Sequence, residues 1–513
     1  MEASSPWRHP VCEHAEWNGG LPAVISERGS LTYAELNGMT NRLVRALRAR
    51  GLKAGDGVCL TCSNRPEFAV VWAACMRAGW VITPINWHLK QDDLLYIVEN
   101  SQARALIAED RAAAGVAGSE GIAALRARIS IGDDPLPGFT PFSAFCAGQD
   151  DHDIKDQVPG KRMSYTSGTT GRPKGVLRPP IDPEIREARR RQTPEPLIAG
   201  ESVSMCTGPL YHAAPLEYDL IAPLTEGATA LLMDKWDTRQ ALSWISRYRV
   251  THTHMVATMF HRLLQIPEEE RRTYDLSSLK RVTHGAAPTP VHIKQAMIDW
   301  LGPVIFEYYG GSEGGGTTIT SEQWLAKPGS VGLPRADAAV YIHDKQGHEL
   351  PAGQRGIVYF RIPREGGFRY FNDPEKTKKA WQGDRFTMGD HGYIDEDGYL
   401  FLTGRTSELI IAGGVNIYPA EIDSVLLMHP AVADAASVGV PNDEYGEEVK
   451  AVIETKKGTA TGGELADDIM AFCRKHLAKY KCPRSVDFVE QLPRSGPGKV
   501  LRQQVRDAYW PAH

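Results

Sequence analysis

The densest run of chemically useful residues lies between Met163 and Val176 and reads Met-Ser-Tyr-Thr-Ser-Gly-Thr-Thr-Gly-Arg-Pro-Lys-Gly-Val. Glycines let a backbone turn its amide hydrogens toward an anion, and Ser and Thr hydroxyls donate further hydrogen bonds. A lysine adds positive charge. The segment therefore predicts a phosphate-binding loop, whose expected contact residues are Thr166, Ser167, Gly168, Thr169, Thr170, Gly171 and Lys174.

The spacing of this loop differs from that of P-loop kinases and ATPases. Those proteins need GxxxxGK followed by Ser or Thr, with the lysine opening a helix. The segment instead closely resembles the signature loop of the adenylate-forming superfamily, which includes acyl-CoA synthetases, firefly-type luciferases and peptide-synthetase adenylation domains. The resemblance extends in order over nearly the whole chain.

Residues 306–313, Phe-Glu-Tyr-Tyr-Gly-Gly-Ser-Glu, resemble the next motif of that superfamily. In it an aromatic ring packs on adenine and a glutamate holds magnesium, and by position the resemblance gives these roles to Tyr309 and Glu313. It also implies that Glu307 approaches the adenine amino group and that Ser312 approaches the α-phosphate.

Two further segments resemble superfamily motifs, one that presents backbone to the ligands and one that contacts the ribose. His284-Gly285-Ala286-Ala287-Pro288 is similar to a small-residue turn against which nucleotide and acyl chain lie, so Ala286 and Ala287 are the expected contacts. Met388-Gly389-Asp390 matches the Thr-Gly-Asp motif except at its first residue. The resemblance implies that Asp390 accepts hydrogen bonds from both ribose hydroxyls and that Arg405 adds a second ribose contact.

The expected catalytic residues are Lys499, His212 and Glu313. Leu492-Pro493-Arg494-Ser495-Gly496-Pro497-Gly498-Lys499 resembles the superfamily's final motif, whose lysine reaches the site of the first domain. Pro209-Leu210-Tyr211-His212 resembles the motif whose histidine lies beside the reacting carboxylate. The acyl pocket expected from these motifs contains His212, Ala213, Gly285 and Gly310.

Alternating patterns in the first half of the chain indicate the elements that position these residues. Leu36, Leu43, Val44 and Leu47 recur at helical spacing within residues 31–50, which predicts an amphipathic helix. Strands at 57–61 and 81–85 alternate with helices at 68–79 and 92–101. Such alternation is typical of parallel α/β units.

A second organisation begins in the last third of the chain. From Lys327 to Leu402, short strands broken by Gly, Pro and Asp predict a small β-rich unit. Helices near 419–428 and 464–477, with strands near 435–440 and 449–454, predict an α+β domain of about 110 residues. We therefore expect an α/β fold with a large N-terminal AMP-binding domain over 1–404, made of two α/β subdomains and a small β-barrel, and a mobile domain over 405–513.

Composition supports an enzyme-sized globular protein. The chain has 513 residues, 42% of them hydrophobic and 24% charged, and a net charge of −5. Nothing in this balance indicates nucleic-acid binding, and the basic run at 186–191 reads as a solvated helix face. We expect no export and no membrane span, hence a cytoplasmic protein. Cys59 and Cys62, although spaced as CxxC, and the alternating His252 and His254 are expected to be structural.

The resemblance implies an AMP-forming acid–CoA ligase that uses ATP, Mg²⁺ and coenzyme A. The carboxylate attacks the α-phosphorus of ATP, and the thiol of CoA then attacks the adenylate carbonyl after the small domain rotates. By the superfamily's spacing the hinge is Ser407, where Asp or Lys is usual, and Gly413 and Gly414 belong to the loop brought to the CoA side.

Other functions and the identity of the acid stay open. The alternative functions are a stand-alone enzyme that loads a carrier protein, a luciferase-like oxygenase and a non-catalytic nucleotide sensor. The oligomeric state is also open, with a homodimer as one option. Small residues at Ala213, Ala214, Ala286, Ala287, Gly310, Gly311 and Gly314 to Gly316 suggest a roomy pocket with no evident cation for a second carboxylate. We expect a hydrophobic monocarboxylic acid, with a fatty, aryl or ring-bearing body.

Overall fold

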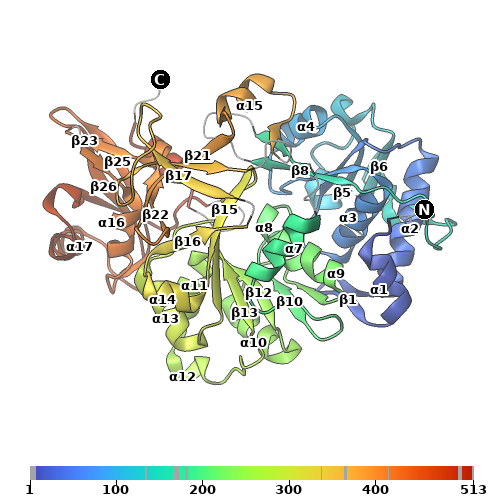
Figure 1. The fold of residues 1–513 in the computed structure, drawn as a ribbon, viewed down its shortest axis with the longest axis horizontal. Coiled ribbons are helices and arrows are strands. Elements are labelled where there is room, and N and C mark those ends of the chain that lie inside the picture. The colour runs from blue at the N-terminus through green and yellow to red at the C-terminus, as the bar shows by residue number, and fades with distance from the viewer. Residues whose placement is uncertain are drawn as a thin grey trace.

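The computed structural model of the chain describes residues 7–132, 136–166, 173–179, 183–336, 338–362, 367–413, 415–494 and 500–510. These residues form three sheets (Figure 1). The N-terminal elements lie at one end of the molecule and the third sheet lies at the other. Among the described residues, no helix combines the length and the apolar character needed to cross a bilayer.

The first sheet is eight-stranded and carries the start and the end of the predicted phosphate loop. Its strands, in spatial order, are β19 (Arg369–Tyr370), β9 (Lys174–Leu177), β8 (Lys161–Thr166), β4 (Val81–Pro84), β3 (Gly57–Thr61), β5 (Ala103–Glu109), β6 (Ala127–Ile131) and β7 (Thr140–Pro141). The strands from β8 to β7 pair in parallel, whereas β8 and β9 form an antiparallel hairpin.

Helices of the first half pack on this sheet and on the next one. They are α1 (Pro10–Asn18), α2 (Tyr33–Ala49), α3 (Pro66–Ala78), α4 (Gln91–Asn100), α5 (Asp110–Ala113) and α6 (Phe142–Cys146), with a 3-10 turn at Glu120–Ile122. A capping box at Thr32 and Glu35 starts α2, which confirms the helix expected over 31–50. Phe68 and Trp72 of α3 belong to the same buried cluster as Val58 of β3, so this helix is almost wholly internal.

The second sheet is fourteen-stranded and holds most of the predicted site residues. In spatial order it contains β17 (Ala339–His343), β18 (Gly356–Arg361), β21 (Arg385–Ile394), β22 (Leu400–Arg405), β16 (Ser330–Pro334), β15 (Gly314–Ile319), β14 (Ile305–Gly311), β13 (Arg281–His284), β12 (His252–Met255), β10 (Val203–Cys206), β11 (Thr229–Leu232), β1 (Pro22–Ser26) and β2 (Gly29–Thr32), with β20 (Trp381–Gln382) paired to β21. The small β-rich unit expected over 327–402 is therefore not a separate sheet, because β16 pairs with β15 and continues the second one.

The helices of this middle region lie between and beside the strands. They are α7 (Pro183–Gln192), α8 (Ala213–Pro215), the π-helical η2 (Leu216–Ile221), α9 (Ala222–Glu226), α10 (Thr238–Tyr248), α11 (Ala257–Leu264), α12 (Glu268–Arg271), α13 (Val291–Leu301), α14 (Ser321–Ala326) and α15 (Pro374–Ala380). Figure 1 shows α7 and α8 near the centre of the molecule, between the two large sheets.

The third sheet is five-stranded and follows a short 3-10 turn, η4 (Thr406–Glu408). It contains β23 (Ile410–Ala412), β24 (Val415–Ile417), β25 (Val432–Asn442), β26 (Gly446–Thr455) and β27 (Ser485–Val489). Helices α16 (Pro419–Leu426), α17 (Gly463–His476) and α18 (Arg502–Asp507), with a turn at Lys479–Lys481, complete it. The elements expected near 419–428, 435–440, 449–454 and 464–477 are all confirmed.

Candidate active site

Strand β14 separates the predicted site into two faces. Alternate side chains of a strand point to opposite sides of its sheet. Glu307 and Tyr309 lie on one face, where Tyr309 contacts Asp390, and Tyr308 lies on the other, where its ring is 5.0 Å from that of Tyr218. We call these the nucleotide face and the acyl face, after the groups that the motifs predict for them.

The predicted ribose contacts meet on the nucleotide face. The hydroxyl of Tyr309 donates to Oδ2 of Asp390 at 2.6 Å, and Nε of Arg405 donates to Oδ1 at 2.9 Å. Asp390 and Arg405 are cross-strand partners of β21 and β22. Asp390 is buried, but each carboxylate oxygen has two lone pairs, so it can still accept from ribose hydroxyls.

The predicted phosphate and metal contacts lie beside β9 and β19. The hydroxyl of Tyr370 donates to Oε1 of Glu313 at 3.0 Å, and the ammonium of Lys174 lies 5.1 Å from the centre of the Tyr370 ring. Burial and the neighbouring amine of Lys376 lower the pKa of Lys174. A cation that repels its neighbour in this way is stabilised when a phosphate arrives.

Glu313 has the chemistry that a magnesium ion needs. Mg²⁺ in nucleotide sites is usually held by one or two carboxylates together with phosphate oxygens and waters. Glu313 is half-buried in the turn between β14 and β15, and Tyr370 fixes its Oε1. Its Oε2 is left to face the nucleotide side, so the residue fits the predicted role.

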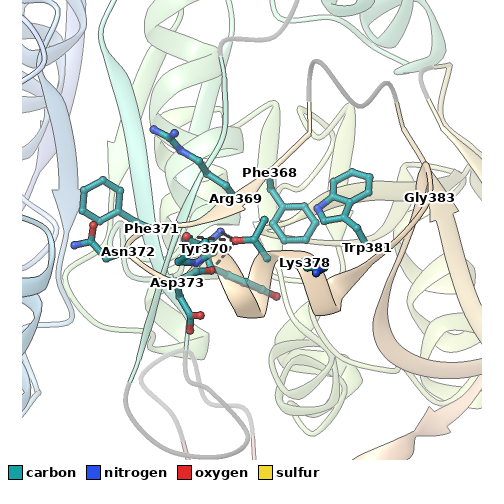
Figure 2. A pocket seen from close by; sticks show the side chains of 11 residues that line it. Phe368, Arg369, Tyr370, Phe371, Asn372, Asp373, Lys378, Trp381 and Gly383 are labelled. Carbon is teal, nitrogen blue, oxygen red and sulfur yellow. Dashed lines mark hydrogen bonds between the residues drawn. The ribbon is translucent and has the colours of Figure 1, made fainter.

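A pocket of about 650 Å³ adjoins this group (Figure 2). It is lined by β19, α15, β20 and the residues between them, with the rings of Phe368 and Trp381 stacked 5.2 Å apart on one side. Tyr370 belongs to the same wall and links it to Glu313. No motif predicted this pocket.

Glu307 is buried in a charged cluster below the predicted adenine site. Nζ of Lys294 donates to its Oε2 at 2.5 Å, and Nε2 of His284 lies 3.5 Å from the same oxygen. The ammonium also lies 4.9 Å from the centre of the Trp324 ring. Burial lowers the pKa of Lys294 and raises that of Glu307, while their mutual attraction opposes both shifts. Oε1 of Glu307 has no hydrogen-bond partner among the described residues and can accept from an adenine amino group.

The small-residue turn after β13 has the close packing that the motif implies. A Cβ atom added to Gly285 would lie 2.6 Å from the carbonyl oxygen of Tyr308 and 2.7 Å from its ring, so only glycine fits. Ala286 has a φ of +66°, a left-handed conformation that is uncommon outside glycine. Ala286 is exposed and Ala287 is half-buried, so both present backbone to the site.

The acyl face is built from aromatic and imidazole rings. Nε2 of His254 is 3.2 Å from the hydroxyl of Tyr308, and its ring stacks on Tyr218 at 5.9 Å. His254 thus supports the wall of the predicted acyl pocket. His252, two residues earlier, bonds the backbone of Glu195 and the hydroxyl of Thr251 and is structural, as expected.

His212 precedes α8 and its Nε2 is buried with no hydrogen-bond partner among the described residues. Its ring lies 4.6 Å from that of Tyr211. Burial lowers the pKa of His212 to about 4. The imidazole is therefore neutral at pH 7 and can donate or accept one hydrogen bond beside Ala213, which opens α8.

The predicted hinge lies between two ion pairs. Arg405, two residues before Ser407, binds Asp390 of the second sheet, and Glu408, one residue after it, binds Nε of Arg502 at 3.2 Å. Arg502 also binds Asp423 at 2.7 Å, which anchors Glu408 to the third sheet and its helices. Ser407 itself is exposed.

Several predicted residues lie outside the part of the chain that the structure describes: Ser167, Gly168, Thr169, Thr170, Gly171, Gly414 and Lys499. The flanking residues are described. Thr166 pairs with Lys174 across the β8–β9 hairpin, and Arg494 bridges to Val500. Gly413 is exposed, and its amide donates to the carbonyl of Tyr445 at 2.8 Å. Ser312 occupies the turn between β14 and β15.

Four residues outside the motifs lie beside predicted site residues or the glycines that follow them: Lys294, Tyr370, Arg178 and Arg335. They come from a helix, a strand and loops that no motif covers, so spacing alone could not predict them. Guanidinium groups of Arg178 and Arg335 lie beside Gly314 and Gly316, two of the small residues expected to line the acyl pocket.

The buried histidines predict a loss of stability in acid. Burial lowers the pKa of His212, His252 and His254 to about 4 each, whereas the unfolded chain binds these protons near pH 6.5. Folded stability therefore falls as pH drops from 6.5 to 4, by up to about 4 kcal/mol per pH unit for three protons. Thermal unfolding across this range checks the slope. His252→Gln should reduce the slope of stability against pH, whereas the control His348→Gln, at an exposed position, should leave it unchanged. An unchanged Tm from pH 6.5 to 5 would contradict the prediction.

Comparisons with known proteins agree with the arrangement. The profile of AMP-binding enzymes matches residues 12–366, and that of the AMP-binding enzyme C-terminal domain matches residues 421–499. A feruloyl-CoA synthase from an Amycolatopsis species is 32% identical over 484 residues, covering 93% of this chain and 94% of that protein. A fatty acid–[acyl-carrier-protein] ligase from Streptomyces coeruleorubidus is 30% identical and covers 97% and 95%.

A solved structure shows the same fold. ATP-bound MatB from Rhodopseudomonas palustris is 27% identical, covers 98% of each chain and superposes with a TM-score of 0.80. The matched profiles cover the strands of the two large sheets except β19, β20, β21 and β22, and three of the five strands of the third sheet. The chain belongs to the AMP-binding enzyme family of the adenylate-forming superfamily and is an AMP-forming acid–thiol ligase.

Proposed function

We propose that the chain is an ATP-dependent acid–CoA ligase that works through an acyl-adenylate. The observation that carries the proposal is the assembly of Tyr309, Asp390 and Arg405 at one end of the nucleotide face and of Lys174 and Glu313 at the other. The first group can bind the ribose and the second the phosphates, and β14 with its following turn connects them. A nucleotide that lies along β14 would reach both groups. Relatives named as acyl-CoA synthases support CoA as the acceptor.

In the first step the carboxylate oxygen of the acid attacks the α-phosphorus of ATP, and the bond to the β-phosphate breaks to release diphosphate. Both reactants are anionic, so the site must offset charge and hold the line of attack. Lys174 and Lys499 supply positive charge, and Ser312 donates to the α-phosphate. Glu313 would hold Mg²⁺, which neutralises phosphate charge when bound.

In the second step the thiol of CoA loses its proton, its sulfur attacks the acyl carbon, and the bond to AMP breaks. The motif places His212 beside the acyl carbon, where its neutral imidazole can position the carbonyl of the acyl-adenylate without adding charge. Lys499 is not needed for this step, because AMP is a good leaving group.

We propose that the small domain, as the part of the chain that follows Ser407, turns as one body about this residue between the two steps. The ion pair of Arg405 fixes the chain on one side of Ser407, and that of Glu408 with Arg502 fixes it on the other. The backbone rotation is therefore concentrated in the residues between these two ion pairs. It would bring Gly413 and Gly414 to the CoA side.

A stand-alone ligase that loads a carrier protein is the second candidate, because one relative of equal coverage is named as such. The discriminating experiment incubates the protein with ATP, Mg²⁺ and a panel of acids, with CoA or with a phosphopantetheinylated carrier protein. Acid-dependent AMP that rises with CoA, and an acyl-CoA seen by mass, would support the proposal. Acylation of the carrier alone would replace it with the second candidate.

Removing the ribose acceptor should weaken nucleotide use. We expect Asp390→Ala to cost about 3 kcal/mol, or roughly 10²-fold in kcat/KM for ATP, because charge-assisted hydrogen bonds contribute about 1.5–3 kcal/mol each. Tyr309→Phe, which removes only the hydroxyl bound to Asp390, should cost tenfold or less. Initial rates measured against ATP concentration give kcat/KM for both variants. An unchanged kcat/KM for Asp390→Ala would contradict the assignment of Asp390 to the nucleotide site.

A further inference from the structure

Helix α15 is held beside the strand that ends the predicted phosphate loop. Tyr370 of β19 pairs with Val176 of β9. The amide of Tyr370 also donates to the hydroxyl of Thr377 at 3.0 Å, which joins the helix to that strand pair. Because Lys174 lies two residues before Val176 in β9, the start of α15 is close to this lysine.

Two lysines of α15 lie on opposite faces of the helix. Successive residues of an α-helix are about 100° apart around its axis. Pro374, Thr377 and Lys378 line the pocket of Figure 2 and so define one face. Lys376 is about 160° from Lys378 around the axis and therefore lies on the face turned away from the pocket.

On that face Lys376 meets the predicted phosphate contacts. Burial and the close amine of Lys376 lower the pKa of Lys174. The carboxylates of Glu313 and Asp373 act on Lys174 in the opposite direction. Two ammonium groups are thus neighbours, and such like charges are stabilised when an anion binds between them.

The donors of the two ammonium groups are free to bind an anion. Within the described part of the chain, neither Lys174 nor Lys376 forms an ion pair. Glu313 accepts from Tyr370 through its Oε1. Oδ1 of Asp373 caps α15 by accepting from the backbone amide of Lys376 at 3.0 Å. Both lysines are half-buried, so an anion can reach them from solvent.

The position of the lysines suits the phosphates beyond the α-phosphate. The superfamily motif assigns the α-phosphate to Ser312, which precedes Glu313 in the turn after β14. Tyr370 links Glu313 to the side of β9 and α15, since its hydroxyl donates to Glu313 and its ring lies 5.1 Å from the ammonium of Lys174. The β- and γ-phosphates of an ATP that passes Ser312 and Glu313 would therefore meet the lysines.

We propose that Lys376, together with Lys174, binds the β- and γ-phosphates of ATP and holds the diphosphate that they become. The inference rests on the proposed function, because it assumes that ATP lies along β14. In the first step the bond between the α-phosphorus and its bridging oxygen breaks, and the electron pair stays on the diphosphate. Negative charge thus grows on the leaving group, and two ammonium groups offset it.

The forward and reverse directions of the first step test this with the full-length enzyme. Pyrophosphate release from ATP and an accepted acid measures the forward direction. ATP formed from synthetic acyl-adenylate and pyrophosphate gives KM for pyrophosphate in the reverse direction. Lys376→Met is compared with Lys376→Arg, which keeps the charge. The matched control is Lys378→Met, which removes an exposed lysine from the other face of the same helix.

We expect Lys376→Met to raise KM for pyrophosphate, and to lower kcat/KM for ATP, by roughly tenfold or more each. Thioester formation from preformed acyl-adenylate and CoA should stay unchanged, because no diphosphate is bound in that step. Lys376→Arg should keep most of the wild-type behaviour and Lys378→Met all of it. Wild-type kinetics in Lys376→Met, or an equal loss in Lys378→Met, would overturn the inference and leave the proposed function intact.

Binding without turnover separates the two proposals further. Thermal unfolding is followed with pyrophosphate, ATP or AMP in the absence of Mg²⁺ and of any acid. Pyrophosphate and ATP should raise the Tm of the wild type more than that of Lys376→Met, whereas AMP, which lacks the outer phosphates, should raise both equally. That pattern without adenylation of any acid would sustain the diphosphate site and contradict the ligase. Equal shifts with pyrophosphate in both proteins would overturn the diphosphate site.

Discussion

Lys499→Ala should lower the rate of adenylate formation by about 10² to 10³, which corresponds to roughly 3–4 kcal/mol of lost transition-state stabilisation. The physical reason is that the lysine offsets negative charge that grows between the carboxylate and the α-phosphate. Thioester formation from a preformed acyl-adenylate should change much less, since AMP then leaves without developing charge on a triphosphate.

The two half-reactions can be measured separately in the same preparation. Exchange of labelled pyrophosphate into ATP reports adenylation, and acyl-CoA formed from synthetic adenylate reports the second step. Lys481→Ala is the matched control, because Lys481 is paired to Glu421 on the same small domain. If Lys499→Ala slowed both half-reactions equally, its proposed role in the first step would be wrong.

Lys294→Met should lower the free energy of unfolding by about 3–5 kcal/mol, because it leaves the buried carboxylate of Glu307 without its positive partner. Lys294 is 1% exposed and Glu307 6% exposed, so water cannot replace the lost ammonium. The flexible methionine side chain fills most of the vacated volume, which leaves the uncompensated charge as the main cost.

A double substitution identifies the cause. Lys294→Met with Glu307→Gln removes both charges and should recover most of the loss. Lys327→Met breaks more exposed pairs, with Asp395 and Asp397, and should change the free energy of unfolding far less than Lys294→Met. Chemical denaturation followed by circular dichroism measures all three. A double variant as unstable as Lys294→Met alone would assign the loss to packing rather than to charge.

Sequence motifs predicted the nucleotide face well and the acyl face poorly. Asp390 and Tyr309 are 81 positions apart, yet the order of motifs was enough to place both at one site, where the structure joins them by a hydrogen bond. The resemblance assigns both residues to the nucleotide, a ligand that does not vary within the superfamily. Arg178 and Arg335 belong to none of its motifs, and their closeness to Gly314 and Gly316 depends on the folded chain, so spacing could not predict it.

The fold was predictable where side-chain periodicity is strong. The helix at 31–50 and the strand at 57–61 agree with α2 and β3 because burial follows the apolar pattern. The β-rich character of residues 327–402 was predictable because its short strands are broken by Gly, Pro and Asp, but its junction with the second sheet was not. Pairing of β15 with β16 depends on contacts between distant segments, which periodicity does not report.

The two faces of β14 have a consequence for how such an enzyme can be altered. On the proposed function, neighbouring residues of this strand serve different ligands. A change at Tyr308 or Gly310 then alters the surface that faces the acid while the backbone that carries Tyr309 keeps its register. Selection for activity on new acids can therefore change residues of the acyl face without weakening ATP binding. A library restricted to the acyl face should yield many variants with altered acid range and few that have lost nucleotide binding.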